Sequence, residues 1–176
     1  TGVTSAPIGI GAGPAVYLVA TTATVLAGTV STVASPNPTV IVKDSSLNPV
    51  SGISVTFAVA APIDGTVVGG AATTNASGVA SATSWTYGAT VRPDTLTATS
   101  AGLAGSPVTF IATTTAGVAT QLVKISGDAQ TGVTGNPLAS PMVVEARDAG
   151  NNPGVGVNIR FRSLPGGGTP ASQPTA

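Results

Sequence analysis

The chain has 176 residues, of which 7% are charged, 3% aromatic and 42% hydrophobic, and six basic residues balance six acidic ones. With neither His nor Cys, the chain cannot form a Ser-His-Asp or Cys-His catalytic arrangement, the usual zinc ligand sets or a disulfide. The scattered basic residues exclude an electrostatic surface for nucleic acid, and no apolar run approaches the roughly 18 residues that a membrane helix needs. The chain begins with Thr1 rather than Met and carries no recognisable signal peptide, so we expect a mature product or an excised fragment.

Short β-branched runs separated by Gly, Pro, Asn and Asp predict many strands joined by turns. In chain order, we expect strands at residues 15–21, 24–33, 39–43, 53–60, 79–87, 94–99 and 108–114, with a weak strand at 71–74. About seven short strands with turn signals between them predict a β-sandwich.

An internal repeat organises these strands. A gapless shift of 104 residues superimposes turn formers and periodic apolar residues, and chance agreement in a biased composition does not explain such a mixed set. The repeat predicts three parts: residues 1–12, a linker or the end of a preceding repeat; residues 13–116, a complete sandwich; and residues 117–176, the first half of a second sandwich. The matched pairs include Gly13 and Gly117, Leu18 and Leu122, Asp44 and Asp148, Asn48 and Asn152, and Phe57 and Phe161.

The repeat also predicts which face of each strand is buried. Positions that are apolar in both copies should face the core, while positions that become charged in the second copy should face solvent, because side chains alternate along a strand. By this criterion Ile41 points outward despite its hydrophobicity, since Glu145 takes its place in the second copy. The residues expected in the core are Val40, Val42, Ile53, Val55, Phe57, Trp85 and Phe110, and Asn158, Arg160 and Arg162 are expected on the solvent face.

Three segments resemble the bacterial immunoglobulin-like domain of the invasin/intimin type. These are VIVKDSSLNPVSGISVTF from Val40, NASGVASATSWTYG from Asn75, and the ending GSPVTF from Gly105, and the opening half of the pattern returns in residues 117–176. The resemblance implies an all-β fold class of tandem Ig-like antiparallel β-sandwiches, as found on bacterial surface proteins, adhesins and some phage structural proteins. It implies no particular ligand, because a fold does not specify a function.

The chain offers few groups for chemistry. Glu145 and Asp148 are the one carboxylate pair that sequence suggests, at a strand end and in its turn, where a solvated turn is the competing interpretation. The loop with Asp148, Asn151 and Asn152 could supply oxygens to calcium, although it holds too few carboxylates, and turn capping is the alternative. We therefore expect no catalytic, metal or cofactor residues. Asn158, Arg160 and Arg162 remain as a candidate contact face for a protein or an anionic glycan.

These observations predict a non-enzymatic, extracellular structural or adhesive module, which acts as a spacer or stalk of a bacterial surface protein. The alternative is a self-assembling subunit of a surface filament or phage appendage. The expected partners are neighbouring Ig-like repeats, copies of the chain itself, or a cell-surface glycan or protein, with no nucleic acid and no membrane span. Low aromatic content argues against a ligand-binding tip, because binding sites concentrate Tyr, Trp and Arg.

The second copy poses a separate problem. Residues 117–176 bring apolar side chains such as Leu122, Ile159 and Phe161, but half a sandwich leaves that face wet and its strand edges unpaired. We therefore predict that strands from elsewhere complete this copy. They come either from a continuation of the polypeptide or from a neighbouring subunit, for which residues 1–12 are the candidate strand.

Overall fold

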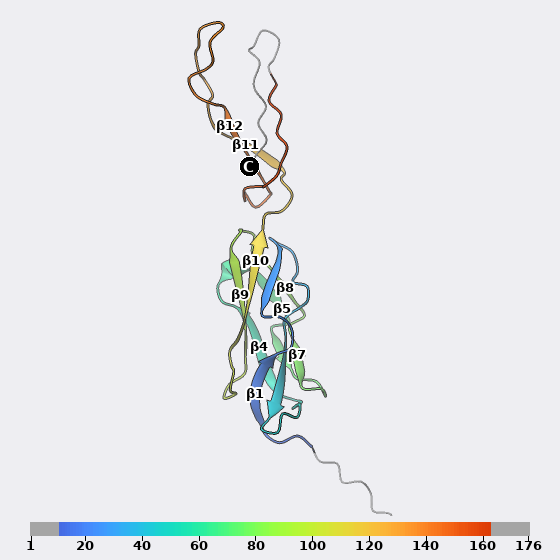
Figure 1. Ribbon diagram of the computed structural model, residues 1–176. Helices are drawn as coiled ribbons and strands as arrows, with labels where there is room; N and C mark the ends of the chain where they lie inside the picture. The colour runs from blue at the N-terminus through green and yellow to red at the C-terminus, as the bar shows by residue number, and fades with distance from the viewer. Residues whose placement is uncertain (1–10, 163–176) are drawn as a thin grey trace, which may run out of the picture.

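The computed structural model describes residues 11–162, and these residues form an all-β structure with one short 3-10 turn, η1 (Pro62–Asp64). Strands β1 to β10 form a β-sandwich, and β10 leads directly into the second unit, which holds β11 and β12 (Figure 1). Residues 1–12 of the predicted organisation lie mostly outside the described residues, as does the end of the second copy after residue 162.

One layer of the sandwich is a five-stranded sheet in the order β2-β10-β9-β4-β6. All of its pairs are antiparallel except β2 with β10, which run parallel from Val25 opposite Ile111 to Thr29 opposite Thr115. Its strands are β2 (Val25–Thr29), β4 (Ser54–Val59), β6 (Ala71–Thr73), β9 (Pro93–Thr99) and β10 (Val108–Thr115).

The facing layer consists of a three-stranded sheet, β1-β3-β7, and a two-stranded sheet, β5-β8. A bridge between Val33 and Thr86 ties the segment after β2 to β8. The strands of this layer are β1 (Ala15–Ala20), β3 (Thr39–Asp44), β5 (Thr66–Val68), β7 (Val79–Ser81) and β8 (Ser84–Thr86).

The core lies between these layers and is formed by alternate residues of the strands. Trp85 and Phe110 are its largest fully buried side chains, and the Trp85 ring meets the Tyr87 ring edge-on at 5.0 Å. Every predicted core residue of the first copy is buried except Ile53, which is half-buried and packs against the cluster. Ile41 is half-buried outside that cluster, beside Val19 and Val79 on the neighbouring strands, which agrees with the predicted outward direction.

The structure corrects several predicted strands. The single strand expected at residues 79–87 is two strands, because β7 pairs with β3 whereas β8 pairs with β5, and Thr83 between them donates its amide to Val68. Strand β5 and the turn η1 were not predicted. The strand expected at residues 24–33 ends at Thr29, where Thr32 turns back to donate both its amide and its hydroxyl to the Thr29 carbonyl.

The second unit repeats the first hairpin of the sandwich in the same register. In β11 (Gln121–Ser126) and β12 (Val143–Arg147), Leu122 lies opposite Ala146, as Leu18 lies opposite Val42 one repeat earlier. The surroundings differ, because Leu18 is 2% exposed and Leu122 is 59% exposed. Leu122 is therefore largely uncovered by the described residues, although its partner Ala146 is buried.

Residues 157–162, the counterparts of residues 53–58, form no strand. Its counterpart β4 pairs with β6 and β9, and the counterparts of β9 one repeat later are not part of this sequence. The predicted alternation nevertheless persists, since Val157, Ile159 and Phe161 are half-buried. The three residues of the candidate contact face, Asn158, Arg160 and Arg162, are exposed.

Among residues 11–162, no helix is long and apolar enough to cross a bilayer.

Phe57 and Ile41 provide a stability test of the face assignment. We expect Phe57→Ala to lower the free energy of unfolding by roughly 3–5 kcal/mol, because it leaves a cavity between the two layers. Ile41→Thr should cost less than about 1 kcal/mol, because Ile41 lies outside the core cluster. Urea melts of both variants measure the difference, and equal losses would contradict the assignment.

Candidate functional site: the junction between the two units

A buried aspartate organises the loop that faces the first sandwich. Asp148 accepts hydrogen bonds from the amide of Gly117 at 2.8 Å and from the amide and side chain of Asn152 at 2.8 to 3.1 Å. The Asn152 side-chain amide is the main reason that the pKa of Asp148 lies below its usual value. Because both carboxylate oxygens accept N–H groups, Asp148 acts as the turn cap that was one of the two interpretations of this loop.

Asn152 connects this loop to the first sandwich. Its Oδ1 accepts a hydrogen bond from the Val91 amide at 2.9 Å, and its Nδ2 donates to the Ala89 carbonyl at 2.8 Å. The side chain is 4% exposed, so these bonds are shielded from water. One asparagine amide therefore bridges a backbone carbonyl and a backbone N–H two residues apart on the other unit.

Gly150 lets the two loops approach closely. A Cβ at this position would lie 2.6 Å from the Ala89 carbonyl oxygen, closer than real Cβ atoms come to such a group. Glycine at this position therefore permits the contact that Asn152 makes.

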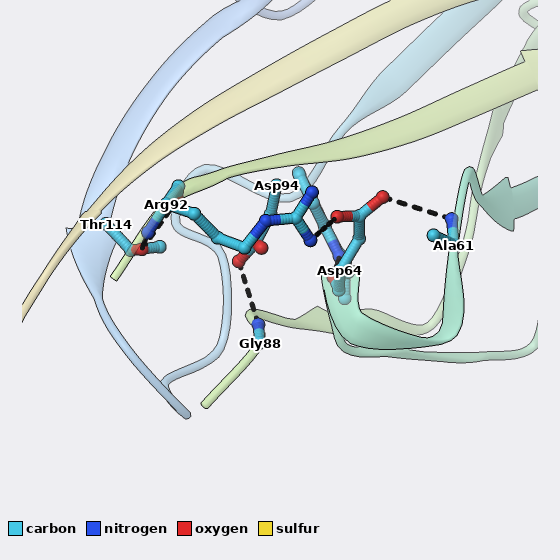
Figure 2. A network of polar contacts seen from close by, with 7 residues as sticks. Ala61, Asp64, Gly88, Arg92, Asp94 and Thr114 are labelled. Carbon is cyan, nitrogen blue, oxygen red and sulfur yellow. Dashed lines mark hydrogen bonds and ion pairs between the residues drawn. The ribbon is translucent and has the colours of Figure 1, made fainter. Parts of the chain in front are cut away.

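We call residues 88–92, on the first sandwich, the junction loop. A polar network beneath the junction loop holds it in place (Figure 2). Arg92 extends from the start of β9 toward η1, and its Nη1 lies 2.5 Å from Oδ1 of Asp64. Asp64 in turn accepts the Ala61 amide at 3.0 Å through its other oxygen. The Arg92 backbone is bound from the opposite side, since its amide donates to the Thr114 hydroxyl at 3.2 Å and its carbonyl accepts from that hydroxyl at 2.8 Å.

Asp94 anchors the other end of the junction loop. Its Oδ2 accepts the Gly88 amide at 2.8 Å, and the carboxyl group is fully buried. Burial raises the pKa of Asp94, and the nearby Asp64 carboxylate adds to this effect, while the Gly88 hydrogen bond and Arg92 oppose it. Within the described residues, Oδ1 of Asp94 and the hydroxyl of Tyr87 have no hydrogen-bond partner.

A groove of about 690 Å³ runs beside the junction. Val91 and Thr114 contribute to its wall from the first sandwich, and Val118, Pro153 and Val155 contribute from the second unit. The lining carries no ionisable side chain, so the groove has no group for acid–base chemistry. Within residues 11–162 there is also no group of three acidic, His or Cys side chains placed to hold a metal ion.

The residues singled out from sequence are only partly involved. Asp148 belongs to the junction, but Glu145 pairs with Arg147 at 3.2 Å and does not join Asp148 in a carboxylate pair. Asn158, Arg160 and Arg162 lie on the segment after the loop and make no salt bridge among the described residues.

Sequence analysis missed the Asp64–Arg92–Asp94 network altogether. Asp64 lies 28 residues before Arg92 and 30 before Asp94. The repeat marks none of the three, because Asp64 aligns with Gly168, while Arg92 and Asp94 lie in the part of the repeat that occurs once. One signal was available in the sequence. The chain has only twelve acidic and basic residues, and three of them fall in this short stretch of the first copy. The cross-unit role of Asn152 was missed too, because a turn-forming Asn gives no sign of what it faces.

The buried Asp94 predicts an unusual pH dependence. Its pKa is raised above 3.8, so just above that pH the folded state keeps a proton that the unfolded state has lost. Its contribution to the free energy of unfolding therefore falls as the pH rises through the folded pKa. The stability of Asp94→Asn relative to wild type should increase over the same range, as measured by urea melts from about pH 3 to about pH 7.

Asp148→Asn is the matched control, because the pKa of Asp148 is lowered. Its stabilising contribution is present above pH 3.8 and is lost as the pH falls through the folded pKa, so the deficit of this variant should shrink in acid. Parallel pH profiles for the two variants would contradict the assigned environments.

Comparison with known proteins adds a limited likeness. No family model and no curated protein matches this chain. A solved structure of FdeC, described as a broadly conserved Escherichia coli adhesin, is similar to it at 17% sequence identity, with a TM-score of 0.49. The alignment covers 76% of this chain and 40% of the solved FdeC chain, so it spans less than half of that chain.

Proposed function

We propose that this chain is a non-enzymatic spacer or stalk segment of an extracellular bacterial surface polypeptide, in which consecutive β-sandwich repeats are held at a fixed mutual orientation. The observation that carries the proposal is the Asn152 bridge, two shielded hydrogen bonds between the units. A freely jointed linker would need no such bridge. A fixed junction suits a part whose task is to hold something else at a distance.

The construction of the junction loop supports the same function. Asp94, Arg92 and Thr114 hold the loop from inside the sandwich, so the groups that Asn152 binds are already in position. Pre-positioned partners reduce the conformational entropy that docking must offset. The result is a stiffer joint than the same two hydrogen bonds would give between mobile loops.

Absence of catalysis is part of this proposal. Asp64 is paired with Arg92, and Asp94 is fully buried, so neither presents a free carboxylate to a substrate. Reproducible turnover of a glycan, ester or peptide, lost on a single substitution in this chain, would refute this part.

Asn152→Ala tests the spacer directly, with Asn48→Ala as its matched control. Both variants remove an Asn that bonds to the aspartate cap of its loop, but only Asn152 also bridges to another unit. We expect Asn152→Ala to speed hydrogen exchange of the Val91 amide on the order of tenfold, the effect of losing one or two neutral hydrogen bonds. Asn48→Ala should leave this amide unchanged.

Orientation provides the second readout of that experiment. Spin labels on one introduced cysteine in each unit can be used without interference, because the chain has no cysteine of its own. We expect a narrow distance distribution in the parent and a broader one in Asn152→Ala. A broad distribution in the parent would overturn the fixed spacer.

A second candidate function is assembly by strand exchange, and the exposed hairpin of the second unit favours it. Leu122 is 59% exposed where its counterpart Leu18 is 2% exposed, so strands from another chain would find an apolar face to cover. This function predicts concentration-dependent oligomers in sedimentation experiments that Leu122→Ser weakens. A monomer at all concentrations would leave the spacer as the only one of the two candidate functions.

A further inference from the structure

The same Asp-centred loop occurs at both ends of the first sandwich. In each copy, the aspartate oxygens accept the amide of the glycine 31 residues earlier at 2.8 Å and the amide of the asparagine four residues later at 2.8 Å. The residue before each asparagine has a positive φ, 66° at Leu47 and 67° at Asn151. The Asp44 loop is therefore built like the loop that docks onto the junction.

The two loops differ in what their asparagines contact. Asn152 is buried against Ala89 and Val91 of the neighbouring unit, whereas Asn48 is exposed. Within the described residues, the Nδ2 of Asn48 donates to Asp44 at 3.1 Å, and its Oδ1 accepts no hydrogen bond. Asn48 is thus held in the docking conformation with an unused acceptor.

We propose that the Asp44–Asn48 loop is a docking surface for a preceding Ig-like repeat. In that repeat, the counterpart of the junction loop presents a backbone carbonyl and a backbone N–H two residues apart, and the side chain of Asn48 binds both. This inference rests on the proposed spacer function and extends it. The occupant follows from continuity with the existing junction, because the Gly13 amide bound to Asp44 brings the incoming chain to this loop as Gly117 does one repeat later.

The chemistry of this contact explains how one loop could accept different repeats. On the first sandwich, the Asn152 side chain binds only main-chain groups. An amide side chain supplies a donor and an acceptor at a fixed spacing. A preceding repeat therefore needs the backbone course of residues 89–91 and not their side chains.

Ser46 sets a limit on this docking. It occupies the position of Gly150, where a Cβ would lie 2.6 Å from the Ala89 carbonyl oxygen in the existing junction. A preceding repeat must therefore sit slightly farther from the loop than the first sandwich sits from the second unit. The upstream junction is expected to be looser than the downstream one, and Ser46→Gly should tighten it.

The test places a copy of residues 13–116 directly before Gly13 of the full chain, which keeps the spacing of 104 residues. Spin labels at cysteines introduced at the exposed Thr113 of the added copy and the exposed Thr56 of the original sandwich report the upstream distance distribution. A second label pair within the added copy verifies that this copy is folded.

We expect a narrow distribution of upstream distances in the parent. Asn48→Ala should broaden it, and Asn48→Asp should broaden it as well, because a carboxylate cannot donate to the carbonyl. Ser46→Gly should narrow it further. An upstream distribution equally broad in the parent and in Asn48→Ala would overturn the proposal, as would one equally narrow in both. Asn152→Ala in the same chain should broaden only the downstream junction. A mobile downstream junction in the parent would instead contradict the spacer function, so the two failures are distinguishable.

Discussion

The buried aspartate at the end of β3, which recurs directly after β12, is the constraint on which the rest of this structure depends. Asp44 and Asp148 each collect hydrogen bonds from an incoming glycine amide and from their own loop. For Asp44 the Gly13 amide is the main cause of a lowered pKa, so the charged form is the one the fold stabilises. A single carboxylate therefore closes the hairpin turn and sets where the chain enters the sandwich.

The junction follows from this local device. Asp148 orients Asn152, the Asp64–Arg92–Asp94 network orients the junction loop, and the two surfaces meet at two hydrogen bonds. Neither hydrogen bond is strong by itself, since a neutral hydrogen bond contributes about 1 kcal/mol net. Both partners are held by bonds within their own unit, Asn152 by Asp148 and the junction loop by Asp94 and Thr114.

The second unit illustrates the difference between local pairing and packing. Its hairpin has the register of the first, because the residues of β11 and β12 and the capped turn after them specify it locally. Burial of Leu122 needs a facing layer, and in the first copy that layer includes β9 and β10, which follow much later in the chain. Two hairpins of the same register therefore differ in burial according to what covers them.

The sequence alone determined the all-β class, the faces of β3 and β4, and the aspartate turns, because periodicity two and turn chemistry are local properties that a repeat makes visible twice. Phe57 could be assigned to the core for the same reason, whereas Phe110 was assigned from its alternation with Val108 and Ala112, and Trp85 from its size. Only the tertiary structure decided that residues 79–87 split between two sheets, that Asp64, Arg92 and Asp94 converge, and that Asn152 crosses to Ala89 and Val91. Each of these depends on segments far apart in the chain, and sequence spacing carries no information about which backbone groups a folded neighbour presents.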